Sequence, residues 1–278
     1  KNGRIQSLIQ TENHLFLYDK NGKIVKGYPV SLPSKSTAKL AVFDYKSNRD
    51  YRILVPCEKN LAMFNQLGER VKGWKAHKQK YAIDSQPIHH RAFGKDFIVC
   101  SNANDEILVL KRVGTSRFEI NEVLKTHSKT QWFAKRNEVE FSFRNSEDQL
   151  VTILNKGLVE TKKAENETPL AFIDQEDLQL SVSQSALLAR YNSKVFSHQF
   201  ENSNSEVFLD RTEHFVAISD KQKEEVYVFN LNRGKQVEKS PFYGNSRPKL
   251  MFDEKQNVLH IYVGGSDGTL YAYQLSVD

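Results

Sequence analysis

A short hydrophobic run followed by a polar turn recurs along the whole chain. Long aliphatic, β-branched and aromatic residues fill the run, and no helical period is present, so each run has the character of a β-strand. Five of the turns contain a glycine, and the first four glycines lie 46, 46 and 43 residues apart. The copies read LFLYDKNG (15–22), LAMFNQLG (61–68), ILVLKRVG (107–114), LVTILNKG (150–157), LARYNSK (188–194), VYVFNLNRG (226–234) and LYAYQLS (270–276).

Each copy belongs to a larger unit of three to four strands. In the second copy, two apolar segments (39–45 and 51–57) precede the run and another (69–75) follows its turn. Three to four strands in every ~40 residues are typical of a propeller blade. The sequence therefore predicts an all-β fold, a β-propeller of four-stranded antiparallel blades. Seven copies predict seven blades, and a six-bladed ring with a displaced end strand is the alternative. Residues 120–138 are ambiguous between a short helix and a long loop.

The two ends of the repeat are incomplete. The first copy has residues for three strands and lacks the innermost one, and the last has no outermost strand after Ser276. Because unpaired strand edges favour association, we expect a strand swap or further chain to close the ring. No linker rich in proline, glycine or serine interrupts the repeat, so residues 1–278 are predicted to form a single domain. Residue 1 is lysine, and we expect the chain to be part of a longer protein.

Composition and charge exclude several classes of protein. The 278 residues include only 2 cysteines, too few for a disulfide scaffold. No apolar run approaches the ~20 residues that a membrane span needs. The formal net charge is +6, but basic and acidic residues alternate. The densest basic cluster, Lys72 to Lys80, is interrupted by Trp74, Ala76 and His77. A nucleic-acid surface would be denser and one-sided, so we predict no nucleic-acid partner.

Several longer phrases resemble a known group of propellers. These are YDKNGKIVKGYPVSLP (18–33), AVFDYKSNRDYRILVPCEKNLAMFNQLGERVKGW (41–74), QPIHHRAFGKDFIV (86–99) and YVGGSDGTLYAYQL (262–275). They are similar to the carboxy-terminal β-propeller of large Bacteroidetes proteins, which in turn resembles quinoprotein-like and integrin-type (FG-GAP) repeats. The resemblance implies a non-catalytic propeller at the cell envelope or in the periplasm, and it implies no reaction.

No residue pattern indicates an enzyme or a bound cofactor. Integrin-type repeats can carry a calcium loop, and the nearest match is Asp44–Asp50, but Lys46 stands at a ligand position and Arg49 replaces the required glycine. We therefore predict no calcium, no other metal and no cofactor. A quinone-dependent dehydrogenase would need a tryptophan docking motif and a vicinal cysteine pair, which the chain lacks. Hydrolase signatures such as G-x-S-x-G and H-E-x-x-H are also absent from the sequence.

The histidine pair and the two cysteines are predicted to be structural. His89 and His90 are neighbours on a predicted strand and must point to opposite faces, so they cannot readily ligate one metal ion. Cys57 and Cys100 are 43 residues apart, which is one repeat. Equivalent positions in adjacent blades lie beyond the ~4.4–6.8 Å Cα separation of a disulfide. We expect two free, partly buried thiols.

The sequence favours an interaction scaffold that binds a protein partner through its turns. The predicted contacts are six basic residues, motivated by the basic cluster in the second and third repeats: Arg49, Lys78, Lys80, Arg91, Arg112 and Arg117. Tyr28 and Trp74 occupy matching positions in the first two repeats and could form an exposed aromatic pair, although packing against the next blade is the favoured interpretation. A glycan-binding propeller is the alternative function, and a degenerate enzyme is the less favoured one.

Overall fold

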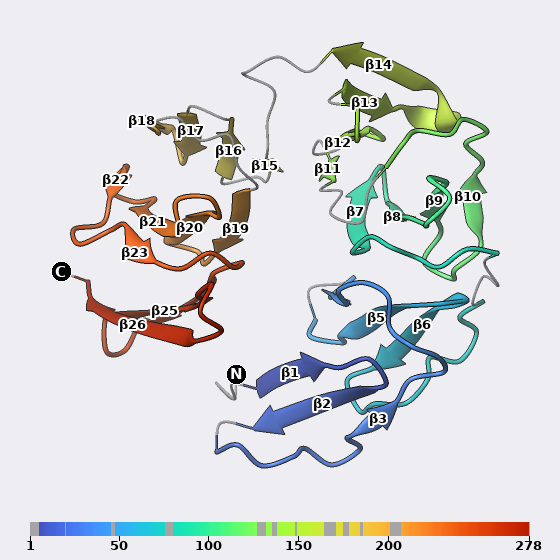
Figure 1. The fold of residues 1–278 in the computed structure, drawn as a ribbon, viewed down its shortest axis with the longest axis horizontal. Coiled ribbons are helices and arrows are strands. Elements are labelled where there is room, and N and C mark those ends of the chain that lie inside the picture. Colours follow the sequence, from blue (N-terminus) through green and yellow to red (C-terminus); the bar gives the residue numbers. More distant parts are fainter. Residues whose placement is uncertain are drawn as a thin grey trace. The chain divides into compact units, whose positions relative to one another are not determined.

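The computed structural model describes eleven segments of the chain. They are residues 6–19, 21–45, 48–75, 80–126, 132–134, 138–147, 149–163, 171–174, 178–183, 186–200 and 207–277. The chain divides into two compact units, Lys1–Lys163 (unit 1) and Ala164–Asp278 (unit 2). Each unit is a series of antiparallel sheets built from strands that follow one another in sequence (Figure 1).

Unit 1 contains four sheets. The first is β1 (Gln6–Gln10), β2 (His14–Asp19) and β3 (Val30–Ser31), and the second is β4 (Ala41–Phe43), β5 (Arg52–Cys57) and β6 (Asn60–Asn65). The third is β7 (Ile88–Ala92), β8 (Lys95–Ser101), β9 (Ile107–Leu110) and β10 (Ser116–Phe118). The fourth is β11 (Phe133–Ala134), β12 (Phe141–Arg144), β13 (Gln149–Ile153) and β14 (Val159–Lys163), with the 3₁₀ turn η1 (Asn155–Gly157) before its last strand.

Unit 2 contains three sheets. The fifth is β15 (Ala171–Asp174), β16 (Leu178–Val182), β17 (Ala186–Tyr191) and β18 (Lys194–Gln199). The sixth is β19 (Val207–Arg211), β20 (Phe215–Asp220), β21 (Glu225–Asn230) and β22 (Lys235–Gln236), with β23 (Phe242–Tyr243) also pairing with β21. The seventh is β24 (Lys249–Asp253), β25 (Val258–Gly264) and β26 (Leu270–Ser276).

The all-β prediction is confirmed, but the prediction of four strands in every blade is wrong. Among the described residues, three sheets have four strands, three have three, and one has five. The segments expected as outer strands at 23–29 and 69–75 contribute only single bridges, Tyr18 to Ile24 and Phe64 to Arg70. Gly27 and Gly73 interrupt these segments with positive φ values, which breaks an extended strand. In the ambiguous stretch 120–138, residues 120–126 have no regular structure and the described remainder contributes β11.

The hydrophobic core of each unit lies between consecutive sheets. In unit 1, separate clusters of buried side chains join the first sheet to the second, the second to the third and the third to the fourth. In unit 2, two clusters join the fifth sheet to the sixth and the sixth to the seventh. Second strands with a neighbouring sheet on each side are buried along almost their whole length, as β8 and β20 are. Their continuous apolar sequence therefore reflects burial on both faces.

Packing against the preceding sheet explains the repeated glycines of the second, third and fourth sheets. At the turns that begin at Asp19, Asn65, Lys111 and Leu154, the N–H of the first residue donates to the carbonyl of the fifth, and the glycine N–H donates back to the first carbonyl. We call these the glycine turns. Gly68 has φ +80°, and a Cβ there would lie 2.6 Å from Val30 Cγ2 and 2.8 Å from the Gly27 carbonyl oxygen. The position therefore requires both a left-handed backbone and the absence of a side chain.

Candidate interaction surface

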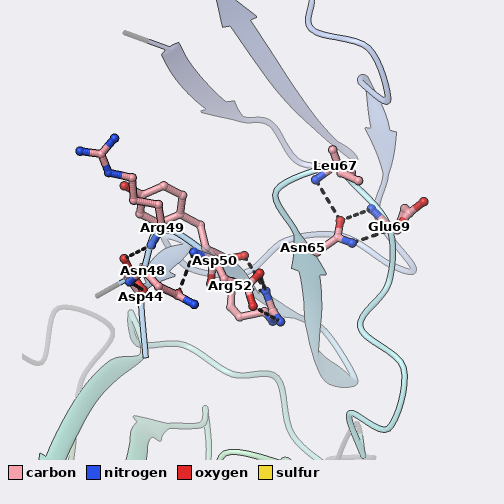
Figure 2. A network of polar contacts seen from close by, with 9 residues as sticks. Asp44, Asn48, Arg49, Asp50, Arg52, Asn65, Leu67 and Glu69 are labelled. Atoms are coloured by element: carbon pink, nitrogen blue, oxygen red, sulfur yellow. Dashed lines mark hydrogen bonds and ion pairs between the residues drawn. The ribbon is translucent and has the colours of Figure 1, made fainter. Parts of the chain in front are cut away.

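The strand register places two turns of the second sheet at one end. Arg52 at the start of β5 lies opposite Phe43 of β4 and Asn65 of β6. The β4–β5 turn and the glycine turn after β6 therefore share an end of this sheet, as Figure 2 shows. In the third sheet, the β7–β8 turn and the end of β9 also lie at the same end of the sheet. Leu110 at the end of β9 lies opposite Ile98, near the start of β8. We call this end of the two sheets the turn end.

The β4–β5 turn is a polar hairpin that presents an exposed cation. The Asp44 carboxylate accepts the main-chain N–H of Asn48 at 3.1 Å and of Arg49 at 2.8 Å, and Arg52 donates to Asp50 at 2.8 Å. The carboxylates that a calcium loop would use thus accept hydrogen bonds from the chain and from Arg52. The Arg49 guanidinium is exposed and points away from this network (Figure 2).

In the third sheet, a buried carboxylate organises the basic residues. Asp96 Oδ1 lies 3.0 Å from His89 Nε2 and 3.2 Å from Arg91 Nη1, and the Asp96 side chain is only 10% exposed. Arg117 Nη2 donates to the main-chain oxygen of Asp96 at 2.8 Å, and its guanidinium carbon lies 4.7 Å from the centroid of the Phe97 ring. Arg117 is therefore held against the sheet, whereas Arg91 has half of its side chain exposed.

Tyr45 connects this network to the second sheet. Its ring packs edge-on against His89 with centroids 4.7 Å apart, and the Arg112 guanidinium carbon lies 4.5 Å from the ring centroid. Burial, with a smaller contribution from the Asp96 charge, raises the pKa of Tyr45 well above its usual range. Burial also lowers the pKa of His89, although the hydrogen bond to Asp96 acts in the opposite direction. The network of Asp96, His89 and Tyr45 is thus largely shielded from water and lies beneath exposed cations. We call these three residues the anchor.

Most of the predicted basic contacts belong to this end of the molecule. Arg91, Arg112 and Arg117 meet in the network around Asp96 and Tyr45, and Arg49 lies on the turn of the neighbouring sheet. Lys80 lies apart from them on the segment that leads into the third sheet, where its ammonium group is 5.1 Å from the Tyr81 ring centroid. The prediction for Lys78 lies outside the described residues.

The favoured interpretation of Tyr28 and Trp74, packing against the next blade, is confirmed, and the alternative of an exposed aromatic pair is wrong. Tyr28 is only 7% exposed and packs in the cluster between the first and second sheets. Trp74 is half-buried, packs against the cluster between the second and third sheets, and donates from Nε1 to the Leu61 carbonyl at 2.8 Å. The shared sequence of the two segments reflects this packing, because each ring covers the side of a neighbouring sheet.

The histidine pair and the cysteines occupy structural positions. His89 faces Tyr45 of the second sheet, whereas the ring of His90 packs edge-on against Phe141 of the fourth sheet, so the predicted opposite orientations are confirmed. Cys57 and Cys100 are free thiols on second strands, and both are buried more completely than expected. Burial raises the pKa of Cys57 to about 11, which disfavours the reactive thiolate.

Two residues central to the network do not stand out as site residues in the sequence. Asp96 has the pattern of an ordinary strand residue, although it stands five positions after Arg91 across a tight hairpin and is its cross-strand partner. Tyr45 is noticeable only as part of a possible calcium loop. The hairpin spacing could signal the first contact, but the second depends on packing between sheets, which one sequence does not encode locally.

The comparisons with known proteins support the propeller fold. The domain described as the Myceliophteria thermophila Cps50 (Swd1) β-propeller aligns with a TM-score of 0.60 and 12% identity, covering 99% of this chain and 93% of that one. BBS1N, solved in complex with ARL6DN, aligns with a TM-score of 0.58 and 13% identity, covering 99% and 89%. BamB from Moraxella catarrhalis aligns with a TM-score of 0.52 and 13% identity, covering 97% and 82%.

The comparisons of sequence, unlike those of structure, found no match. No protein-family model and no curated protein matches the chain, so the narrower resemblance to Bacteroidetes proteins stays a prediction. The described residues include no helix that could span a membrane. Together, the stacked antiparallel sheets and the similar solved structures show that this chain has a β-propeller fold.

Proposed function

We propose that the chain is a non-catalytic β-propeller that serves as a protein-interaction scaffold and binds an acidic partner at the turn end. The observation that supports it is that arginine side chains lie above the buried anchor, whose contacts hold them in place. Arg49 and Arg91 are exposed, and the Arg112 guanidinium carbon lies 4.5 Å from the Tyr45 ring centroid. Guanidinium groups bind carboxylates and phosphates in a fixed geometry.

Rigidity is the physical contribution of the scaffold. The anchor contacts of Asp96, His89 and Tyr45 fix the hairpins before a partner arrives. Binding of a partner then costs less free energy, because the loops of the scaffold are already ordered. Complementary charge would also accelerate association and make it sensitive to salt. BBS1N, a similar propeller, was solved together with a protein partner, which supports an interaction role.

The number of blades, the location of the protein and the lack of a cofactor are part of the same proposal. We take the seven sheets as seven blades of one propeller domain, with a six-bladed ring as the alternative. We place the protein at the cell envelope or in the periplasm and assign it no cofactor and no catalytic residue. The sequence resemblance supports the location, and the seven copies of the repeat support the blade number.

A pull-down from the native lysate, read by quantitative mass spectrometry, tests the interaction. The bait is the parent chain or a variant carrying Arg49→Glu and Arg91→Gln, the two exposed arginines of the turn end. Glutamine is used at position 91 because a glutamate would repel the nearby Asp96. We expect the parent to retain a salt-sensitive partner that the variant binds about tenfold more weakly, since each exposed ion pair contributes ~0.2–1 kcal/mol.

The matched control carries Lys162→Glu and Lys235→Gln, which changes the net charge by the same amount at exposed positions on β14 and β22. It should retain the partner as the parent does. Recovery of the same partners in equal amounts by the parent and both variants would overturn the proposal.

A second candidate function is glycan binding, and one aromatic cluster in unit 2 favours it. The rings of Tyr243 and Tyr271 meet edge-on at 5.0 Å, and the Tyr271 hydroxyl donates to Asp267 at 2.8 Å. Tyr243 is 38% exposed. Exposed aromatic rings beside a carboxylate are suited to the C–H and hydroxyl groups of a sugar. A glycan array probed with the parent and with Tyr243→Ala tests this function, and an array without hits, or with hits that Tyr243→Ala leaves unchanged, rejects it.

A further inference from the structure

Two glutamates and a histidine gather on neighbouring turns of unit 2. Glu213 and His214 lie between β19 and β20, and Glu254 lies between β24 and β25. One ligand atom from each residue lies within 4.8 Å of the other two. Both glutamates are exposed, and the imidazole is half-buried. The proposed interaction at the turn end of unit 1 makes no use of these residues.

The backbone of this cluster is fixed by residues outside it. The Tyr191 hydroxyl donates to the main-chain oxygen of Glu213 at 3.1 Å, and the Leu231 N–H donates to that of His214 at 2.9 Å. The Thr212 hydroxyl oxygen accepts the N–H of His214 at 3.3 Å. Contacts from β17 and from the residue after β21, together with Thr212 in the turn, therefore set the position of the β19–β20 turn.

The imidazole is also oriented by groups that are not candidate ligands. The Asn232 side-chain amide donates to His214 Nδ1 at 3.1 Å, and the Phe252 ring packs edge-on against the imidazole at 5.6 Å. Metal-binding histidines typically use one nitrogen for the ion while a neighbour holds the other. A half-turn of the Asn232 amide lets its oxygen accept Nδ1–H instead, which leaves the lone pair of Nε2 available.

The charge of the cluster is unbalanced. Among the described residues, neither Glu213 nor Glu254 forms an ion pair. In contrast, Asp210 on the same sheet as Glu213 pairs with Lys249 at 3.1 Å. Two carboxylates at this separation repel each other, and a nearby cation relieves the repulsion. The arrangement is therefore more favourable with a divalent cation than without one.

We propose that Glu213, His214 and Glu254 bind a first-row divalent transition-metal ion, with Zn²⁺ as its representative. One imidazole nitrogen with two carboxylate oxygens suits Zn²⁺ and its neighbours, whereas Ca²⁺ and Mg²⁺ prefer oxygen ligands alone. Metal–ligand distances of ~2.0–2.2 Å require the donor atoms to approach to about 3.4 Å. Rotation of the two exposed glutamate side chains brings them closer, and water completes the coordination.

Isothermal titration of the tag-free chain with ZnCl₂ tests the proposal, and Co²⁺ absorption reports the coordination geometry. We expect the parent to bind one ion. His214→Ala and the double variant Glu213→Gln/Glu254→Gln should each weaken binding by at least about tenfold. Asn232→Ala, which removes a positioning residue, should weaken it about tenfold. The control is His260→Ala, a half-buried histidine on β25 that should leave binding unchanged.

The conservative double glutamine variant keeps the test valid if His214→Ala fails to fold, because both glutamates are exposed. Anomalous diffraction at the zinc edge would then place the ion between the two turns. The proposal is overturned if the parent binds no Zn²⁺ or Co²⁺, or if the control weakens binding as much as the ligand variants do. It is also overturned if the double variant binds as tightly as the parent.

Discussion

The glycine turns are nearly the same from sheet to sheet, whereas the turns between first and second strands differ in chemistry. Four glycine turns repeat one pair of main-chain hydrogen bonds. The other class carries Arg49 on the β4–β5 turn and Arg91 beside the β7–β8 turn in unit 1, and Glu213 with His214 in unit 2. Packing against the preceding sheet constrains the glycine turns of the second, third and fourth sheets and leaves the other class free to vary. Function should therefore be sought in the variable turns.

The largest expected effect comes from breaking a glycine turn. Gly68→Ala should destabilise the chain by about 2–5 kcal/mol, because a left-handed alanine costs ~1–2 kcal/mol and overpacking adds ~1–3 kcal/mol. Gly22→Ala is the matched control, since Gly22 has φ +74° but a Cβ added there would meet nothing within 4 Å. It should cost only the ~1–2 kcal/mol of backbone strain. Urea unfolding measures both, and equal losses would contradict the packing explanation.

A smaller loss of stability is expected at the variable turns, which are the turns between first and second strands. Its size distinguishes a buried anchor residue from an exposed surface residue. Asp96→Ala should cost about 2–3 kcal/mol, because it leaves the half-buried His89 and the exposed Arg91 without their shared carboxylate. Glu213→Ala, measured with a metal chelator, should change stability by less than ~0.5 kcal/mol, as is usual for an exposed residue. If the two variants unfold at the same urea concentration as the parent, Asp96 is not an anchor.

The smallest expected effect is a pH dependence that arises at His89. Burial lowers the pKa of His89 in the folded chain, so the unfolded chain takes up the proton first as the pH falls. The stabilisation is present above the unfolded value of ~6.5 and is lost progressively below it. His89→Gln should therefore lose less stability than the parent between about pH 8 and about pH 5. If the stability of the parent and of the variant changes with pH in the same way, His89 is not the source of the pH dependence.

The sequence predicts the repeat well and the site only in part. The alternation of apolar runs and turns locates the strands, and the glycine spacing marks the packed turns, because both are local properties. The pattern overpredicts outer strands, since Gly27 and Gly73 adopt positive φ values that the apolar residues around them do not reveal. The favoured prediction that Tyr28 and Trp74 pack against the next blade is confirmed, because both rings belong to clusters between sheets.

The variable turns show the same limit more clearly. The arginines Arg91, Arg112 and Arg117 could be selected from local charge, but their common dependence on Asp96 and Tyr45 arises between strands and between sheets. Glu213 and Glu254 are 41 residues apart and come together only through the stacking of the sixth and seventh sheets. Contacts of this kind follow from the fold and have no signature in a short window of sequence.

Site-specific photo-crosslinking tests the central claim that a partner binds at the turn end. A benzoylphenylalanine replaces Leu67 at the turn end or Leu188 on β17, two leucines that are 57% and 56% exposed. We predict that one protein partner crosslinks from position 67 and not from position 188, and that Arg49→Glu with Arg91→Gln abolishes this crosslink. A partner captured equally from both positions, or captured from position 67 regardless of the arginines, would contradict the account.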